Sequence, residues 1–202
     1  MFGFTQRRAR SKAGTESVKL HSIAAMMRGQ SFAGNFEAGG APYSFTYDPR
    51  RSSLIGRKLQ LNGRLTVFDA RPNARVPPHS VNNVRAMLVS AQGGIGTAPL
   101  RKKMPDDVSP VRPDLPVVES TGSLSFCGVL YFKLSPLDGR ALGVRAVMSP
   151  LQLNVRLAPV SDAERNLQGV FSSIVDALLG KRLDIRAASD HVRDLNKILA
   201  RA

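Results

Sequence analysis

The sequence predicts an α+β fold, predominantly antiparallel β, with two tandem similar β-rich units, each followed by a helix, and a C-terminal helix. Apolar and polar residues alternate over residues 58–68 and again over residues 151–157, which is typical of strands with one buried and one solvated face. Apolar residues after position 161 instead recur at helical spacing. A proline-dense stretch over residues 98–117 separates the two halves and predicts a linker.

The remaining strands are predicted by the same period of two. They are expected over residues 17–27, 31–36, 43–47 and 122–134. Pro49 directly follows Asp48, and this pair is expected to end the third of these strands, because proline donates no hydrogen bond to a strand ladder.

Two helices have boundary signals. Ser161 and Glu164 form a capping box and Gly180 follows the apolar stripe, so a helix is expected between them. A narrower stripe predicts a final helix over about residues 189–201. In the first half, a stripe after Ser80 also has helical spacing and predicts a helix, with a strand as the alternative because β-branched residues are frequent. That stripe consists of Val81, Val84, Leu88 and Ala91.

The two halves resemble each other in sequence. Residues 59–65 read LQLNGRL and residues 151–157 read LQLNVRL, with similar elements before and after them. Chance similarity between alternating strands is the alternative, but the shared order favours an internal duplication. The predicted organisation is a basic N-terminal arm (1–15), a first β-rich unit (16–97), a Pro-rich linker (98–117), a second β-rich unit ending in a helix (118–180) and a C-terminal helix (181–202).

The strong positive charge narrows the class of partner. The 202 residues carry 29 Lys and Arg against 15 Asp and Glu, a formal net charge of +14. Such a charge attracts phosphate groups, anionic membrane surfaces or acidic proteins. Cys127 is the only cysteine, so no intrachain disulfide is expected, and no apolar run reaches the ~18 residues of a spanning helix. We expect a cytoplasmic protein that is not secreted and keeps its basic N-terminus.

No arrangement of residues in the sequence predicts catalysis. His21, His79 and His191 are far apart and lack metal-ligand spacing, and no nucleophile-elbow or phosphate-loop motif is present. We therefore expect a non-enzymatic protein with no catalytic residue, no cofactor and no metal site.

The cations supply the candidate binding residues. We expect a structural or accessory subunit of a larger assembly, which docks on an acidic protein surface through Arg-rich segments. The candidates lie in the N-terminal arm, on both sides of a predicted turn and in the linker: Arg7, Arg8, Arg10, Lys12, Arg50, Arg51, Arg57, Lys58, Arg101, Lys102 and Lys103.

Other binding functions stay open. A nucleic-acid-binding or viral coat or matrix-type protein would hold phosphates with the arm. The bases of the nucleic acid would stack on the rings of Tyr43, Phe45 and Tyr47. The favoured interpretation is instead that these rings form part of the core. The protein could also lie peripherally on an anionic membrane surface. A β-rich carrier of an apolar ligand would have a cavity lined by Leu59, Leu61, Phe126 and Leu153.

Overall fold

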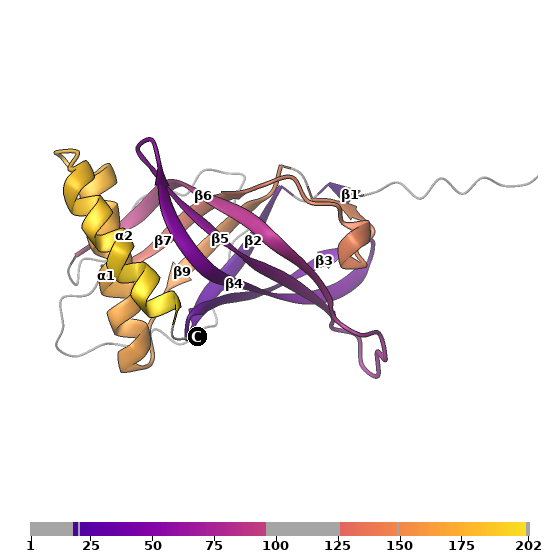
Figure 1. Ribbon diagram of the computed structural model, residues 1–202. Helices are drawn as coiled ribbons and strands as arrows, with labels where there is room; N and C mark the ends of the chain where they lie inside the picture. The colour runs from indigo at the N-terminus through magenta and orange to yellow at the C-terminus, as the bar shows by residue number, and fades with distance from the viewer. Residues whose placement is uncertain (1–17, 20, 96–125, 149, 201–202) are drawn as a thin grey trace, which may run out of the picture.

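The fold is dominated by β-strands, which form a closed barrel with two helices against it (Figure 1). The computed structural model describes residues 18–19, 21–95, 126–148 and 150–200. The elements are β1 (Val18–Lys19), β2 (Ser22–Arg28), β3 (Ser31–Ala38), β4 (Ala41–Ile55), β5 (Lys58–Asp69), β6 (His79–Ile95), β7 (Phe126–Leu134), the 3₁₀ turn η1 (Arg140–Leu142), β8 (Ala146–Val147), β9 (Gln152–Leu157), α1 (Asp162–Leu179) and α2 (Ile185–Leu199).

The barrel joins strands from both halves of the chain. Its order is β2-β3-β4-β5-β6-β7-β9, and the circle closes where β9 pairs with β2 in the parallel direction. All other neighbours in the barrel are antiparallel, while β1 and β8 form a separate parallel pair. The α+β prediction is therefore confirmed in its coarse form. The arrangement as two tandem units is not confirmed, because the strands of both halves share one ladder.

The prediction of a helix after Ser80 is wrong, because this stretch forms strand β6. The register of β6 shifts twice, first near Asn83, whose φ is 58°, and again between Leu88 and Ser90. Each shift inserts one extra residue, so inward-facing positions are three apart at the shifts and two apart between them. An alternating strand with two bulges thus imitates helical spacing in the sequence.

Strand β4 continues beyond the Asp48-Pro49 pair, contrary to the prediction that this pair ends it. The ladder with β5 instead shifts between Pro49 and Arg51. Gly63 pairs with Pro49 on one side and with Val84 of β6 on the other. A Cβ at Gly63 would lie 2.2 Å from the carbonyl oxygen of Asp48, so only glycine allows the strands to approach this closely.

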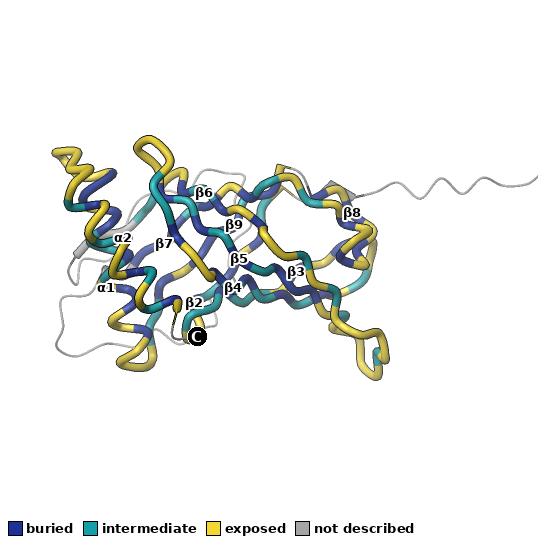
Figure 2. The backbone as a smooth tube through the Cα atoms, in the orientation of Figure 1, coloured by how far each residue is buried: buried dark blue, intermediate teal, exposed yellow. Residues whose placement is uncertain are grey.

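Aromatic rings fill the interior of the barrel. The ring of Phe32 in β3 lies 6.1 Å from that of Tyr47 in β4, 5.9 Å from that of Phe132 in β7 and 6.0 Å from that of Phe171 in α1. Burial raises the pKa of the Tyr47 phenol, whose hydroxyl donates to the carbonyl oxygen of Val84 at 3.0 Å. Figure 2 shows buried and exposed positions alternating along the strands around this core.

Different segments close the two ends of the barrel (Figure 1). At one end, α1 places Phe171 against the ring cluster, and α2 packs on α1 and β4. At the other end, the segment that contains η1 and β8 buries Leu142, Val144, Ala146 and Met148. None of the helices in the described part of the chain is long and apolar enough to cross a membrane.

Both helices have polar caps. The predicted capping box at α1 is confirmed, since Ser161 accepts from the N–H of Glu164 and the Glu164 carboxylate accepts from the N–H of Ser161. The same carboxylate accepts from Gly29 in the β2–β3 turn at 2.7 Å, which ties α1 to the barrel. Helix α2 begins at Ile185, several residues before the expected start, because Asp184 caps it by accepting from Ala187.

Candidate anion-binding surface

Charge is divided unequally between the barrel and the helices. The described residues 21–160 carry thirteen Lys and Arg but only four Asp and Glu. Residues 161–200 carry six of each, and three Asp residues there form ion pairs three positions apart along the helices, Asp162–Arg165, Asp190–Arg193 and Asp194–Lys197. The positive charge of the folded body therefore resides on the barrel.

The β4–β5 hairpin is the most uniformly basic part of the barrel. Its cations are Arg50, Arg51, Arg57, Lys58 and Arg64, and no Asp or Glu occurs between Asp48 and Asp69. Within the part of the chain that the structure describes, none of these cations forms an ion pair. Five like charges on one hairpin repel one another, and this repulsion lowers the stability of the fold. We expect such a cluster of charges to be kept where a partner binds it.

The hairpin places its predicted cations around one turn. Arg50 and Arg51 lie in β4, which continues through residues 52–55 before the turn, and Arg57 and Lys58 follow the tip glycine, Gly56. The prediction that these four residues flank a turn is confirmed. Arg50 has no partner across the ladder, since Pro49 pairs with Gly63 and Arg51 pairs with Asn62. The bulge leaves both neighbouring arginines exposed, whereas regular alternation would turn one of them inward.

The register extends this basic surface across neighbouring strands. Arg51 pairs with Asn62, and Asn62 pairs on its other side with Arg85 of β6. One row further along, Gln60 pairs with Met87, which pairs with Lys133 of β7. Opposed residues on paired strands point to the same face, so all of these side chains share the outer face of the barrel. We call this surface the basic wall; it consists of Arg50, Arg51, Lys58, Arg64, Arg85 and Lys133.

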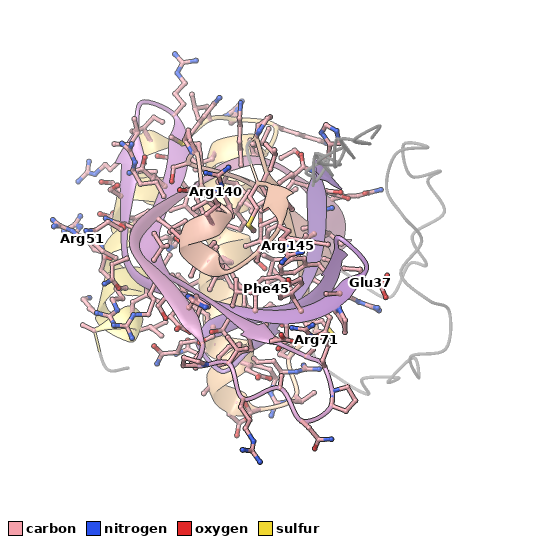
Figure 3. All side chains as sticks on the ribbon, turned by 90° about the vertical axis from the view of Figure 1, so that its right-hand side faces the viewer. Glu37, Phe45, Arg51, Arg71, Arg140 and Arg145 are labelled. Atoms are coloured by element: carbon pink, nitrogen blue, oxygen red, sulfur yellow. The ribbon has the colours of Figure 1, made fainter. Side chains whose placement is uncertain are left out.

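Strand spacing sets the separation of the charges on the basic wall. Neighbouring strands lie about 4.8 Å apart, so the backbones of Arg51 and Arg85 are roughly 10 Å apart across β5. Neutral amides lie between the cations, with Gln60 and Asn62 on β5. Figure 3 shows Arg51 projecting away from the barrel axis, whereas Phe45 lies inside the barrel. The wall is therefore a broad array of cations and hydrogen-bond donors, and it is not a closed pocket.

Several contacts fix the wall in place. Arg64 Nε donates to Asn82 Oδ1 at 3.0 Å, which aligns its side chain along β6. The backbone of Arg85 accepts from the N–H of Ser135 at 2.7 Å and donates to the Ser135 hydroxyl at 3.2 Å. These contacts fix the Arg64 side chain and the backbone of Arg85, so this part of the wall needs little reordering when a partner binds.

Helix α2 supports the hairpin along one edge of β4. The side-chain oxygen of Asn196 accepts from the backbone N–H of Ser52 at 2.6 Å and from its hydroxyl at 3.0 Å. The Asn196 amide nitrogen donates back to the carbonyl oxygen of Ser52 at 2.9 Å. One carboxamide thus satisfies both backbone groups of Ser52, just as a neighbouring strand would. The hairpin carries its arginines on its outer face and is anchored to the helices along the free edge of β4.

Only part of the predicted set of site residues falls on this surface. Arg50, Arg51 and Lys58 belong to the wall and Arg57 lies at its tip. The arm and linker candidates lie outside the described residues: Arg7, Arg8, Arg10, Lys12, Arg101, Lys102 and Lys103. Arg64, Arg85 and Lys133 were missed, because only the cross-strand register brings them beside the hairpin.

The aromatic residues do not contribute a stacking platform to the wall. Tyr43, Phe45 and Tyr47 are buried, at 8%, 1% and 0% exposure, which confirms the interpretation that they form the core. On the neighbouring strand β7, Tyr131 is only half-buried, but its hydroxyl donates to the side chain of Gln92 at 2.8 Å. The wall is built from charges and amides, so the contacts that it offers are ionic and hydrogen-bonded.

The histidines do not come together in the part of the chain that the structure describes. The three histidines lie on different elements: His21 precedes β2, His79 begins β6 and His191 lies in α2. Among the described residues, no group of three or more His, Cys, Asp and Glu side chains is placed to hold a metal ion. No protein-family model matches the chain, and no match was found among curated proteins or among solved structures.

Proposed function

We propose that this protein is a non-enzymatic accessory subunit of a larger assembly, which holds an acidic partner protein against the basic wall. The observation that carries the proposal is the charge of the barrel: between Asp48 and Asp69 the β4–β5 hairpin presents five cations and no acid, and none of these cations has an ion-pair partner among the described residues. The net charge of +14 would steer such a partner toward the protein before contact.

The composition of the wall supports a carboxylate-bearing partner. Four of its six cations are arginines, whose planar guanidinium groups bind carboxylates through two parallel hydrogen bonds. The neutral amides of Gln60 and Asn62 add donors and acceptors that a mixed protein surface can match. Protein interfaces tolerate such polar rims because specificity and approach rate depend on complementary charge.

Nucleic acid is the second candidate, and the same array of cations favours it. Phosphate oxygens accept bidentate arginine contacts as carboxylates do, and a wall without exposed rings would hold the backbone without reading bases. Binding of this kind weakens steeply as salt rises. Transport of an apolar ligand is not proposed, because Leu59, Leu61 and Leu153 are fully buried in the packed core.

A pair of matched variants tests the proposal. Arg51→Gln with Arg85→Gln removes two charges from the wall, and Arg140→Gln with Arg145→Gln removes two exposed charges at the barrel end away from the helices. Figure 3 shows Arg140 and Arg145 over that end and Arg51 at the side of the barrel. Both variants change the net charge equally, so a difference between them reports the position of the charge.

The assay is affinity capture of partners by the full chain at low salt, with and without nuclease treatment. We expect a defined acidic protein to be retained after nuclease, with its affinity about ten-fold weaker for the wall variant and nearly unchanged for the other. If nuclease abolishes capture, the nucleic-acid candidate takes its place. Equal loss in both variants would mean that net charge alone attracts the partner, and the assigned surface would be wrong.

A further inference from the structure

A second surface of unusual composition lies at the turn between α1 and α2. Three large aliphatic side chains are exposed within seven residues: Leu179 at 48%, Leu183 at 42% and Ile185 at 40%. Lys181, Arg182 and Arg186 alternate with them and are exposed as well. We call residues 179–186 the helical tip. Scattered exposed leucines are ordinary, but a compact group of three interleaved with cations is the composition of a segment that lies in a lipid interface.

The helical tip is held in one conformation by its own backbone. The N–H of Gly180 donates to the carbonyl oxygen of Asp176 at 3.0 Å, and the N–H of Asp184 donates to that of Ala177 at 2.8 Å. A Cβ at Gly180 would lie 2.3 Å from the Asp176 oxygen, so the turn requires glycine. Since the exposed aliphatic side chains lie on a fixed turn, their exposure is a property of the fold.

The charge of the helical tip is positive despite the acid within it. The Asp184 carboxylate accepts from the N–H of Ala187 and offsets the positive end of α2. Lys181, Arg182 and Arg186 form no ion pair with any residue that the structure describes. The ion pairs of the two helices all lie outside residues 179–186. The three cations of the helical tip can therefore bind an external anion beside the aliphatic side chains.

The shape of the molecule places this tip at an extremity. In Figure 1 the turn between α1 and α2 projects at the upper left, and the tip of the β4–β5 hairpin projects upward. The hairpin tip repeats the same composition, with Ile55 exposed at 53% and followed by Arg57 and Lys58. The two tips share a composition of exposed aliphatic side chains and cations, which suits an anionic lipid layer.

We propose that the helical tip is a membrane anchor, which inserts Leu179, Leu183 and Ile185 into the headgroup region of an anionic bilayer while its cations bind lipid phosphate and carboxylate groups. The helical tip shares no residue with the basic wall, although the hairpin tip includes Lys58 of the wall, and the inference stands without the proposed function. Each cation near an anionic surface strengthens binding about five-fold, and the aliphatic side chains add the apolar part of the free energy. Neither part alone gives stable attachment, which is why their coincidence at one tip is informative.

The sequence offers a clean spectroscopic test, because the chain contains no Trp. In the full-length protein, Leu183→Trp places a single reporter at the helical tip. Val160→Trp is the matched control, since Val160 is 70% exposed and lies just before α1, at the opposite end of that helix. Both proteins are mixed with phosphatidylcholine vesicles with or without about 30 mol% phosphatidylserine. Emission wavelength and quenching by brominated lipid report insertion.

We expect the emission of the Leu183→Trp protein to shift to shorter wavelength and to be quenched only with phosphatidylserine present, while that of the Val160→Trp protein stays unchanged. Vesicle flotation completes the test. Replacing Leu179, Leu183 and Ile185 by Ser should lower vesicle binding about ten-fold with an unchanged unfolding temperature, whereas Val160→Ser should bind as the unaltered protein does. Flotation of the triple variant equal to that of the unaltered protein would overturn the proposal and assign vesicle binding to another basic surface. Equal emission shifts at both reporter positions, or none at either, would overturn it too.

Discussion

Replacing Glu164 should expose how the helices are fixed to the barrel. Its carboxylate is buried, with 4% exposure, and accepts three backbone N–H groups, from Val160 at 2.6 Å, Gly29 at 2.7 Å and Ser161 at 3.3 Å. One contact caps α1 and another reaches the β2–β3 turn of the barrel. The Glu164→Gln variant keeps the shape of the side chain but removes its charge and turns one acceptor into a donor that faces N–H groups.

The expected loss of stability is about 3 kcal/mol. A hydrogen bond to a charged group contributes about 1.5–3 kcal/mol, and two of the three contacts to Glu164 are short. Water can reach part of the freed backbone, which keeps the cost below the full sum of the bonds. With a urea dependence of about 2 kcal/mol per M, the unfolding midpoint should fall by about 1.5 M.

The effect should depend on pH with a definite sign. Burial by itself raises the pKa of Glu164. The backbone N–H donors of Val160, Gly29 and Ser161 lower this pKa by more, so the pKa of Glu164 in the folded protein lies below its ordinary value. A lowered folded pKa contributes stability above the unfolded value, about 4.3, and that stability is lost as pH falls through the folded pKa. The difference between Glu164→Gln and the unaltered protein should therefore be full at pH 7 and shrink below about pH 4.

A neighbouring acid provides the control for this prediction. Asp162 lies in the same first turn of α1 but is exposed, and its ion pair is with Arg165 on the surface. Asp162→Asn should cost less than about 1 kcal/mol at any pH, since surface ion pairs contribute little. If Asp162→Asn and Glu164→Gln destabilise equally, the buried contact to the barrel does not hold the helix, and the reasoning fails. A pH-independent loss at Glu164 would contradict the assigned role of its charge.

Two further changes probe the strand geometry and the support of the hairpin, each by urea unfolding. Gly63→Ala should cost at least about 2 kcal/mol, because the added Cβ would lie 2.2 Å from the carbonyl oxygen of Asp48 in β4. Gly169→Ala is the control: a Cβ there meets no atom within 4 Å, and the change should stabilise α1 by about 0.5–1 kcal/mol. Equal effects of the two substitutions would contradict the close approach of the strands at Gly63. Asn196→Ala should cost about 2 kcal/mol, because it leaves both backbone groups of Ser52 unpaired. The control Asn166→Ala, at an exposed position, should cost less than about 0.5 kcal/mol. Similar losses at both asparagines would refute the anchoring role of Asn196.

The elements that sequence patterns predicted well are those whose signals are local. The capping box of Ser161 and Glu164 located the start of α1, because both partners lie within one turn of the chain. Residues 58–68 were recognised as a strand because the extra residues at the register shifts lie in the neighbouring strands β4 and β6, so that β5 keeps its own alternation. Helix α2 was placed too late, since its cap, Asp184, lies beyond the narrow apolar stripe used to find it.

The errors came from information that a linear pattern does not carry. A bulge is defined by the pairing of two strands, so the bulges of β6 near Asn83 and Val89 were invisible and the strand was taken for a helix. The similarity between residues 59–65 and 151–157 was interpreted as duplication, and the structure places both segments in strands of one barrel without confirming two tandem units. The same limit applied to the candidate site. Its hairpin cations were found, but Arg85 and Lys133 join them only through the register.

The contact between Asn196 and Ser52 has a consequence for self-association. Strand β4 pairs with β3 only as far as Tyr47, so among the described residues its last part has no strand on that side. A bare strand edge is a template on which another chain can add a strand, the first step toward aggregates. The carboxamide of Asn196 occupies the polar groups of Ser52 on this edge. Helix α2 thus covers this strand edge, and its detachment would leave the edge open to pairing with a strand of a further copy.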